Sequence, residues 1–171
     1  MTKIRYGIVG TGGMGSGHAR TMQSIEECSL TAVCDIVPEV AEAVGEEYNV
    51  PFFTDYHDLI DSDLVDAVMV ATPHYFHPEI CIYAMERGKP VISEKPIAVT
   101  VSGADAMVEA AQRTGVPFAV MHQSRSEPIW QAAWDLVKSG RLGELYRTML
   151  VYADFRSQAY YNSAGWRATW D

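Results

Sequence analysis

The sequence is short of the features that mark membrane, secreted and nucleic-acid-binding proteins. No apolar run approaches the ~18 residues of a membrane span, and residues 1–10 lack the pattern of a signal peptide. The three cysteines are odd in number and include no Cys-x-x-Cys pair, which favours reduced thiols in a cytoplasmic protein. Basic residues are few: 13 Lys and Arg face 22 Asp and Glu, a formal net charge of −9. Nucleic-acid binding needs a basic surface, so we expect neither a nucleic-acid nor a membrane partner.

Apolar residues make up 48% of the 171 residues, which is enough to bury a core. Through the first 121 residues, short apolar runs of strand length alternate with segments of helix length, a pattern typical of parallel βαβ units. The predicted strands are 4–9, 30–34, 66–71, 90–93 and 116–121. The predicted helices are 13–25, 40–47, 79–87, 101–113 and 128–138.

The first predicted strand ends in the glycine-rich segment Gly10–Gly15, which matches the pattern G-x-G-x-x-G. Between a strand and a helix, this pattern is typical of dinucleotide binding. The first glycine makes a tight turn, the second lets the backbone approach a pyrophosphate, and the third lets the helix pack on the strand. Backbone N–H groups at the helix start then hold the anion. We assign cofactor contacts in this segment to Gly10, Gly12, Gly13, Met14 and Gly15.

Asp35 lies twenty residues after Gly15, at the end of the second predicted strand. A carboxylate there accepts hydrogen bonds from both adenosine ribose hydroxyls and repels a 2′-phosphate, so NAD is favoured over NADP. The alternative is that Asp35 only caps the helix that begins near Pro38. Methyltransferases also combine a glycine-rich loop with such an acid, so S-adenosylmethionine is a second candidate ligand. The fold class we predict is α/β, with a doubly wound parallel sheet of strand order 3-2-1-4-5-6 over residues 1–121.

Ligands of doubly wound sheets lie at the carboxyl ends of the strands. The third predicted strand is followed by Thr72-Pro73 and His77, the fourth by Glu94-Lys95-Pro96, and the fifth by His122-Gln123. Polar and ionisable side chains therefore follow each of these strand ends, where a ligand site requires them.

Together these residues resemble the glucose–fructose oxidoreductase, inositol dehydrogenase and rhizopine catabolism (Gfo/Idh/MocA) family. The resemblance rests above all on Glu94-Lys95-Pro96, and it continues in order through 123–128, 140–143 and Trp166-Arg167. It implies an NAD(P)-dependent oxidoreductase acting on CH–OH groups of sugars, inositols or related polyols. It also implies a Rossmann domain over residues 1–121 and, from 122 to 171, the beginning of a C-terminal α+β substrate and oligomerisation domain.

The resemblance also assigns roles to individual residues. In the family, the lysine of the Glu-Lys-Pro motif lies beside the reacting carbon, and the glutamate contacts the cofactor, so Lys95 is assigned to catalysis. A lysine suits this chemistry, because oxidation of a secondary alcohol leaves developing negative charge on oxygen, which an ammonium stabilises. The further cofactor-binding assignments are Thr72, Pro73, His77, Glu94, Lys95 and Gln123.

Three histidines, His18, His74 and His77, are candidates for a functional role. His77 is assigned to the cofactor side, with capping of a helix N-terminus as the alternative. His74 and Gln123 stand where the family often has Asn, which leaves the substrate class open. The pair His74-x-x-His77 has no further ligands at zinc-like spacing, so we expect no metal site. His18 is expected to be exposed or locally packed and receives no function.

The last fifty residues differ in pattern. Residues 144–155 alternate in a way that predicts a long strand of an antiparallel sheet. Because one strand and an aromatic-rich segment cannot bury themselves, we expect the chain to be a fragment of a longer protein. We expect this fragment to bind NAD without oxidising polyols and to form a homo-oligomer through residues 144–155. A non-catalytic NAD-binding module or sensor is the alternative function.

Overall fold

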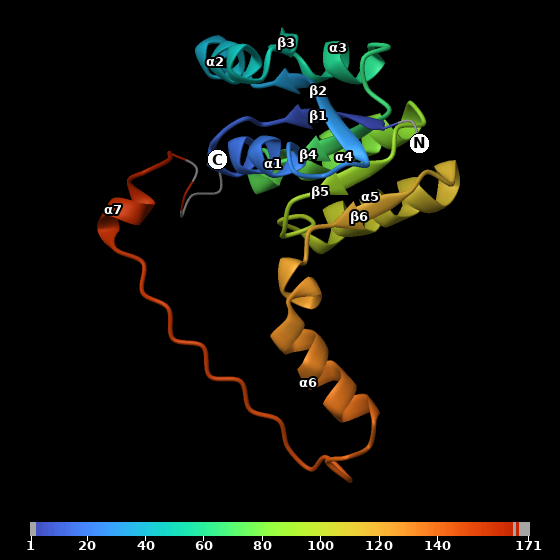
Figure 1. Cartoon of the computed structure of the whole chain (residues 1–171), viewed down its shortest axis with the longest axis vertical. Helices are drawn as coiled ribbons and strands as arrows, with labels where there is room; N and C mark the ends of the chain where they lie inside the picture. The colour runs from blue at the N-terminus through green and yellow to red at the C-terminus, as the bar shows by residue number, and fades with distance from the viewer. Residues whose placement is uncertain (1–2, 166, 168–171) are drawn as a thin grey trace. The chain divides into compact units, whose positions relative to one another are not determined.

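The computed structural model describes residues 3–165 and residue 167, and the chain divides into two compact units, Met1–Met121 and His122–Asp171. The first unit contains a six-stranded sheet in which every pair of neighbours is parallel, in the order β3-β2-β1-β4-β5-β6 (Figure 1). The strands are β1 (Ile4–Val9), β2 (Cys28–Cys34), β3 (Phe52–Phe53), β4 (Ala67–Val70), β5 (Val91–Ser93) and β6 (Phe118–Val120). This order confirms the predicted doubly wound fold.

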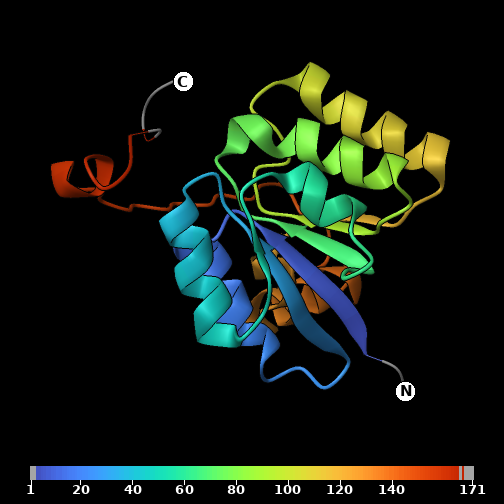
Figure 2. The same ribbon diagram turned by 90° about the horizontal axis from the view of Figure 1, so that it is seen from above.

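Helices cover both faces of the sheet (Figure 2). One face carries α1 (Gly13–Met22) and α2 (Pro38–Tyr48); the other carries α3 (Tyr56–Asp61), α4 (His77–Glu86) and α5 (Val101–Thr114). Two apolar cores result, one on each side of the sheet. All four residues of β4 are buried, as a central parallel strand covered on both faces requires.

Local sequence signals explain most helix ends. A proline in the first turn opens α2 and α4, where its missing N–H is not needed. Asp55 and Thr100 cap α3 and α5 by accepting backbone N–H groups with their side chains. Asn49 and Gly115, with φ of 53° and 68°, end α2 and α5 in the left-handed conformation.

The predicted order 3-2-1-4-5-6 requires a sixth strand, but the sequence pattern predicted no range for it, which is β3, and none for the helix α3. The strand β3 is only two residues long and pairs with the end of β2, so it leaves no alternating pattern in the sequence. The helix α3 has six residues, and it contributes buried Leu59 and Ile60 to a core. An element this short presents less than two helical turns of pattern, which is too little for periodicity to identify.

The second unit contains a 3-10 helix η2 (Gln123–Ser126), α6 (Pro128–Lys138) and α7 (Gln158–Tyr161). The prediction of a long strand over residues 144–155 is wrong, because residues 145–157 have no regular secondary structure. A strand exists only when a neighbour pairs with its N–H and C=O groups, and no described segment of the chain pairs with this one. Trp166 lies outside the described residues. No described helix is long and apolar enough to cross a membrane.

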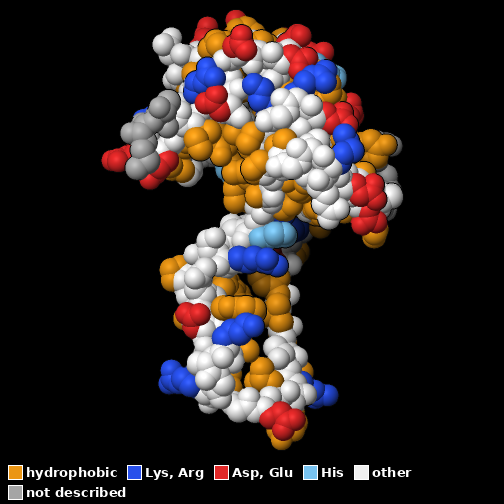
Figure 3. Space-filling view, turned by 90° about the vertical axis from the view of Figure 1, so that its right-hand side faces the viewer, with side chains coloured by type: hydrophobic (Ala, Val, Ile, Leu, Met, Phe, Trp, Pro, Cys, Tyr) orange, Lys and Arg blue, Asp and Glu red, His pale blue; other side chains and the backbone are white. Residues whose placement is uncertain are grey.

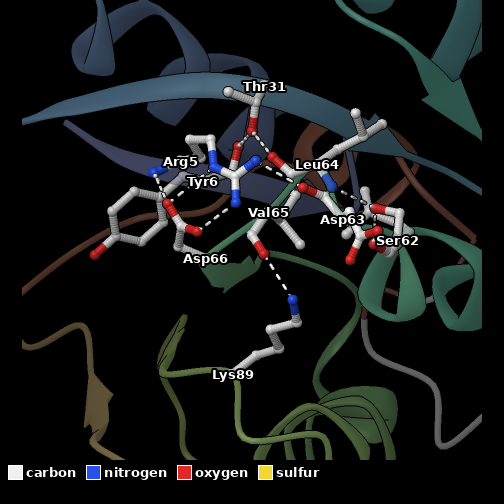
Figure 4. A network of polar contacts seen from close by, with 10 residues as sticks. Arg5, Tyr6, Thr31, Ser62, Asp63, Leu64, Val65, Asp66 and Lys89 are labelled. Atoms are coloured by element: carbon white, nitrogen blue, oxygen red, sulfur yellow. Dashed lines mark hydrogen bonds and ion pairs between the residues drawn. The ribbon is translucent and has the colours of Figure 1, made fainter. Parts of the chain in front are cut away.

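At the amino ends of the strands, Arg5 of β1 is bonded to the turn that precedes β4 (Figure 4). Its Nε and Nη2 donate to the two carboxylate oxygens of Asp66 at 3.0 and 2.6 Å, and its Nη1 donates to the Asp63 carbonyl at 2.6 Å. The hydrogen bonds from Arg5 lower the pKa of Asp66 to about 2. This forked pair fixes β1 beside β4 at the end of the sheet opposite the carboxyl ends.

The forked pair predicts an acid-sensitive contribution to stability. Because the folded pKa of Asp66 lies below the ordinary ~3.9 of an unfolded Asp, its contribution is present above that pH and is lost as the pH falls toward 2. We expect Asp66→Asn to melt at a lower temperature than the wild type at pH 7, with a difference that shrinks between about pH 4 and pH 2. Thermal melts across this range measure it. Asp63→Asn, which removes a neighbouring charge and spares the fork, is the control; a gap that is constant with pH would contradict the assignment.

Candidate functional site

The glycine-rich segment forms a tight turn from β1 into α1, and its glycines are required by close contacts. Gly10 has a φ of +88°, and a Cβ there would lie 2.7 Å from the backbone of Ala71 and Thr72. A Cβ on Gly15 would lie 1.9 Å from the Gly10 carbonyl oxygen, so only glycine lets α1 begin directly against the end of β1. In contrast, a Cβ on Gly12 or Gly13 would meet nothing within 4 Å.

The start of α1 is suited to an anion. Its N-cap is Gly12, which has no side chain to occupy the free N–H groups, and its first turn has no acidic residue. Gly12, Gly13 and Met14 are exposed, so these N–H groups are open to a ligand. The arrangement therefore offers positive helix-dipole charge and unoccupied donors to a phosphate group.

Asp35 follows β2 and is bonded to the glycine-rich segment. Its Oδ2 accepts the Thr11 backbone N–H at 2.9 Å, and its Oδ1 accepts the Val37 N–H at 3.0 Å. Val37 is itself the N-cap of α2, so Asp35 does not cap the first helical turn, the alternative considered from the sequence. The Thr11 hydroxyl also donates to Oδ2, at the longer distance of 3.4 Å, so Oδ1 is the oxygen that keeps a free lone pair for a ribose hydroxyl. Burial raises the pKa of the adjacent Cys34 thiol to about 12, so this thiol adds no charge beside Asp35.

After β4 the chain passes through Thr72 and Pro73 into the 3-10 helix η1 (His74–Phe76) and then α4. The Thr72 hydroxyl is buried and has no hydrogen-bond partner in the described structure, so it is free to bond a ligand. The His77 side chain is fully buried, with its two ring nitrogens 2.9 Å from the Pro96 carbonyl and 3.0 Å from the Thr72 carbonyl. The His77 ring therefore links the loop after β4 to the loop after β5. An enclosed ring presents no surface to a ligand, which counts against the assignment of His77 to cofactor contact, and the His77 side chain does not cap the start of α4.

After β5, Glu94 and Lys95 differ sharply in exposure. Glu94 is 5% exposed, and Lys95, the next residue, is exposed. Within the described part of the chain, no group bonds the Lys95 ammonium, which leaves it available to a substrate. The buried Glu94 carboxylate is bonded instead to His18 of α1, with 2.7 Å between Oε1 and Nε2. The expectation that His18 is merely exposed or locally packed is therefore wrong.

Sequence reasoning missed Thr11 and His18 because both act through contacts with distant residues. Thr11 is 2% exposed and bonds Asp35, while His18 bonds a carboxylate 76 positions along the chain. One feature of the sequence does point to a packed His18. It follows Gly15 by three residues, which places it on the same side of α1 as the close contact with β1. Gln123 opens η2 in the second unit, and its role at the cofactor stays a prediction. No group of His, Cys, Asp or Glu able to hold a metal ion is found among residues 3–165 and 167.

A family model described as "Oxidoreductase family, NAD-binding Rossmann fold" matches residues 4–122. The chain belongs to this Gfo/Idh/MocA family. The inositol 2-dehydrogenase of Rubrobacter xylanophilus is 36% identical over 143 residues, which are 82% of this chain and 41% of that protein. The 2,7-anhydro-N-acetylneuraminate hydratase of Escherichia coli is 37% identical over 142 residues, 83% of this chain and 38% of that protein. The chain thus spans about 40% of the length of these relatives.

Solved structures of Gfo/Idh/MocA proteins superpose on the chain. The WlbA dehydrogenase of Bordetella pertussis, in complex with NADH and UDP-GlcNAcA, gives a TM-score of 0.88 at 30% identity, covering 97% of this chain and 51% of that one. The scyllo-inositol dehydrogenase of Lactobacillus casei, with NAD(H) and scyllo-inositol bound, gives 0.80 at 28% identity, covering 84% and 43%. The prediction of NAD as cofactor is confirmed at the level of the family. The open backbone at Gly12 and Gly13 and the unpartnered Thr72 hydroxyl fit such a ligand.

The position of Asp35 predicts how the cofactor is discriminated. We expect Asp35→Asn to weaken NAD binding by about 10- to 100-fold, because hydrogen bonds to a charged acceptor are lost, and to weaken NADP binding less. The amide oxygen is still able to accept the Thr11 N–H, while the amide NH2 group then faces the Val37 N–H, which loses its acceptor. Titration of NAD and NADP followed by calorimetry measures both constants. Asp105→Asn makes the same chemical change on exposed α5; unchanged NAD affinity in Asp35→Asn would disprove the ribose contact.

Proposed function

We propose that this chain is the cofactor-binding part of an NAD-dependent oxidoreductase that moves a hydride between a CH–OH group of a sugar, inositol or related polyol and nicotinamide. The observation that carries the proposal is the exposed, unpaired Lys95 ammonium at the carboxyl end of β5, the sheet edge that also carries the glycine-rich segment. Methyl transfer has no use for a cation at this place, and a plain NAD-binding module does not require one.

The residues that would hold the cofactor follow from their places at this edge. The N–H groups at the start of α1 would bind the pyrophosphate, and Asp35 would bind the adenosine ribose. Thr72 would offer its buried hydroxyl near the loop after β4. The bound nicotinamide supplies a carbon that accepts or returns a hydride.

Lys95 would stabilise the oxygen of the reacting alcohol. As the C–H bond gives up its hydride, negative charge grows on this oxygen, and the ammonium donates a hydrogen bond to it. The hydroxyl proton must leave in the same reaction for the ketone to form. An ammonium has no lone pair, so Lys95 accepts this proton only as the neutral amine, after its exposed side chain has released one of its own protons to solvent. The ammonium formed in this way then donates the hydrogen bond to the oxygen.

The proposed substrate class comes from related proteins. The L. casei dehydrogenase binds scyllo-inositol, and the B. pertussis enzyme binds UDP-GlcNAcA, each with a nicotinamide cofactor. Two relatives at 37% identity are named as hydratases, which favours a second candidate function. Hydration adds water and forms no net NADH, so consumption of substrate has to be measured alongside the cofactor.

We further propose that the protein is cytoplasmic. Cys28, Cys34 and Cys81 are all buried and free. Burial raises the pKa of Cys34 and of Cys81 to about 12, so both thiols stay protonated at neutral pH. Protonated, enclosed thiols resist oxidation and serve as apolar core groups, as is common for cysteines in a reducing compartment.

We also propose that the chain associates with a second copy of itself. The segment from residue 142 to residue 155 exposes large apolar side chains. Hydrophobic side chains are seen at the surface of the molecule in Figure 3. Their exposed fractions run from 50% to 89%. These residues are Leu142, Leu145, Tyr146, Met149, Leu150, Val151, Tyr152 and Phe155. An apolar surface of this kind favours burial against another protein surface, and a second copy of the chain offers one.

Charged substitutions test the self-association. We expect the double variant Leu150→Glu, Val151→Glu to shift the chain toward the monomer, because a buried interface would have to desolvate two carboxylates. Light scattering coupled to size-exclusion chromatography measures the mass. Arg147→Glu, in the same segment, changes an exposed polar side chain and serves as the control. A wild-type chain that is monomeric at micromolar concentration would end this part of the proposal.

The catalytic role of Lys95 can be tested in a chimera. The unit ending at Met121 is joined to the second domain of the L. casei scyllo-inositol dehydrogenase, and NADH formation is followed with scyllo-inositol. We expect Lys95→Ala to lower kcat by about 100- to 1,000-fold with little change in NAD affinity, because the ammonium acts on the transition state. Lys3→Ala, an exposed lysine before β1, is the control. Near-normal turnover by Lys95→Ala would refute the role, and an inactive chimera that binds NAD would favour the non-catalytic module.

A further inference from the structure

His18 is joined to the segment that carries Lys95 by one short contact. Its Nε2 lies 2.7 Å from Oε1 of Glu94, and both side chains are largely enclosed, at 16% and 7% exposure. The helix α1 supplies His18 one turn after the close contact of Gly15 with Gly10. Glu94 directly follows β5, two strands away from β1 in the sheet. The contact therefore connects the helix that begins at the glycine-rich segment to the loop after β5.

The second oxygen of Glu94 faces the next residue. Its Oε2 accepts the backbone N–H of Lys95 at 3.1 Å, while the Glu94 N–H donates to the Val70 carbonyl at 2.8 Å. Within the described part of the chain, His18 and the Lys95 N–H are the two donors to this carboxylate. A carboxylate so enclosed has little water to bind, so its orientation depends on these donors.

We propose that His18 is a positioning residue that holds Glu94 and, through it, the backbone of Lys95. The inference deepens the proposed function and rests on it for its catalytic consequence. A carboxylate without a proton accepts only, so His18 donates from Nε2. Because α1 also begins with the donors for a pyrophosphate, seating the phosphate groups and placing Lys95 depend on the same helix.

A matched set of substitutions separates donation from packing. Gln places an amide N–H near the position of Nε2, so His18→Gln keeps the donor. Phe keeps the flat ring and removes the donor, so His18→Phe keeps only the volume. His57 on α3 provides the control, because its Nδ1 lies 2.6 Å from Asp55 in an exposed pair, with 43% and 55% of the side chains accessible. His57→Phe loses a histidine–carboxylate pair whose partner is Asp55 and not Glu94.

The direct test is to measure the resonance and the hydrogen exchange of the Lys95 backbone amide in the 171-residue chain. This measurement requires no catalytic turnover. We expect His18→Phe to shift the Lys95 amide resonance and to speed its hydrogen exchange by about two- to tenfold, the worth of one lost hydrogen bond. His18→Gln and His57→Phe should leave both near wild-type values. In a Glu94→Gln background, His18→Phe should add nothing, because the carboxylate that relays the effect is gone. Spectra of the ring nitrogens should show a proton on Nε2 of His18 in the wild type.

Two results would overturn the proposal. One is a Lys95 amide that exchanges equally in the wild type and His18→Phe, provided that melting curves show both to be folded. The other is a His18→Gln chain that behaves like His18→Phe, which would leave packing as the role of His18. In the chimera, His18→Phe should lower kcat more than it weakens NAD binding. A chimera without turnover counts against the proposed function alone, because the amide readout does not depend on it.

Discussion

The structure depends on how closely α1 begins against the end of β1. A Cβ at residue 15 would lie 1.9 Å from the Gly10 carbonyl oxygen, so the crossing allows no side chain at all. This contact has three consequences. It leaves the N–H groups of Gly12 and Gly13 exposed. It also places Thr11 beside Asp35 and His18 beside Glu94. A larger residue at position 15 would move the helix and disturb all three together.

The carboxylates of Asp35 and Glu94, at this edge of the sheet, are held by the same kind of contacts. Asp35 accepts the backbone N–H groups of Thr11 and Val37, and Glu94 accepts His18 and the Lys95 N–H. In each case one donor belongs to the glycine-rich segment or to the helix that follows it. The acids therefore follow any movement of that helix, and their orientation is fixed before a ligand arrives. Such preorganisation lowers the cost of ordering a site on binding.

The sequence predicts those features of this fold that depend on neighbouring residues. It does not predict features that depend on a partner far away in the sequence. Parallel strands, prolines that open helices and the glycine-rich segment each leave a pattern within a few residues, and the doubly wound fold class followed from them. The strand predicted over 144–155 had the right alternation, yet a strand needs a neighbour, and the sequence of one segment does not reveal its partner. The contacts of His18 with Glu94 and of His77 with Pro96 were missed for the same reason, since these partners lie 76 and 19 positions away.

The segment between α6 and α7 also has a practical consequence. Residues 144–156 take part in no backbone–backbone hydrogen bond within the described structure, and most of their side chains are exposed. Proteases bind their substrates as open chain, so this is where a nick would fall first. Lys and Arg are sparse in the segment, with Arg147 and Arg156 as the trypsin positions it contains. A brief digestion would leave the glycine-rich segment, Asp35 and Lys95 on one piece, a convenient route to a smaller cofactor-binding domain for crystals.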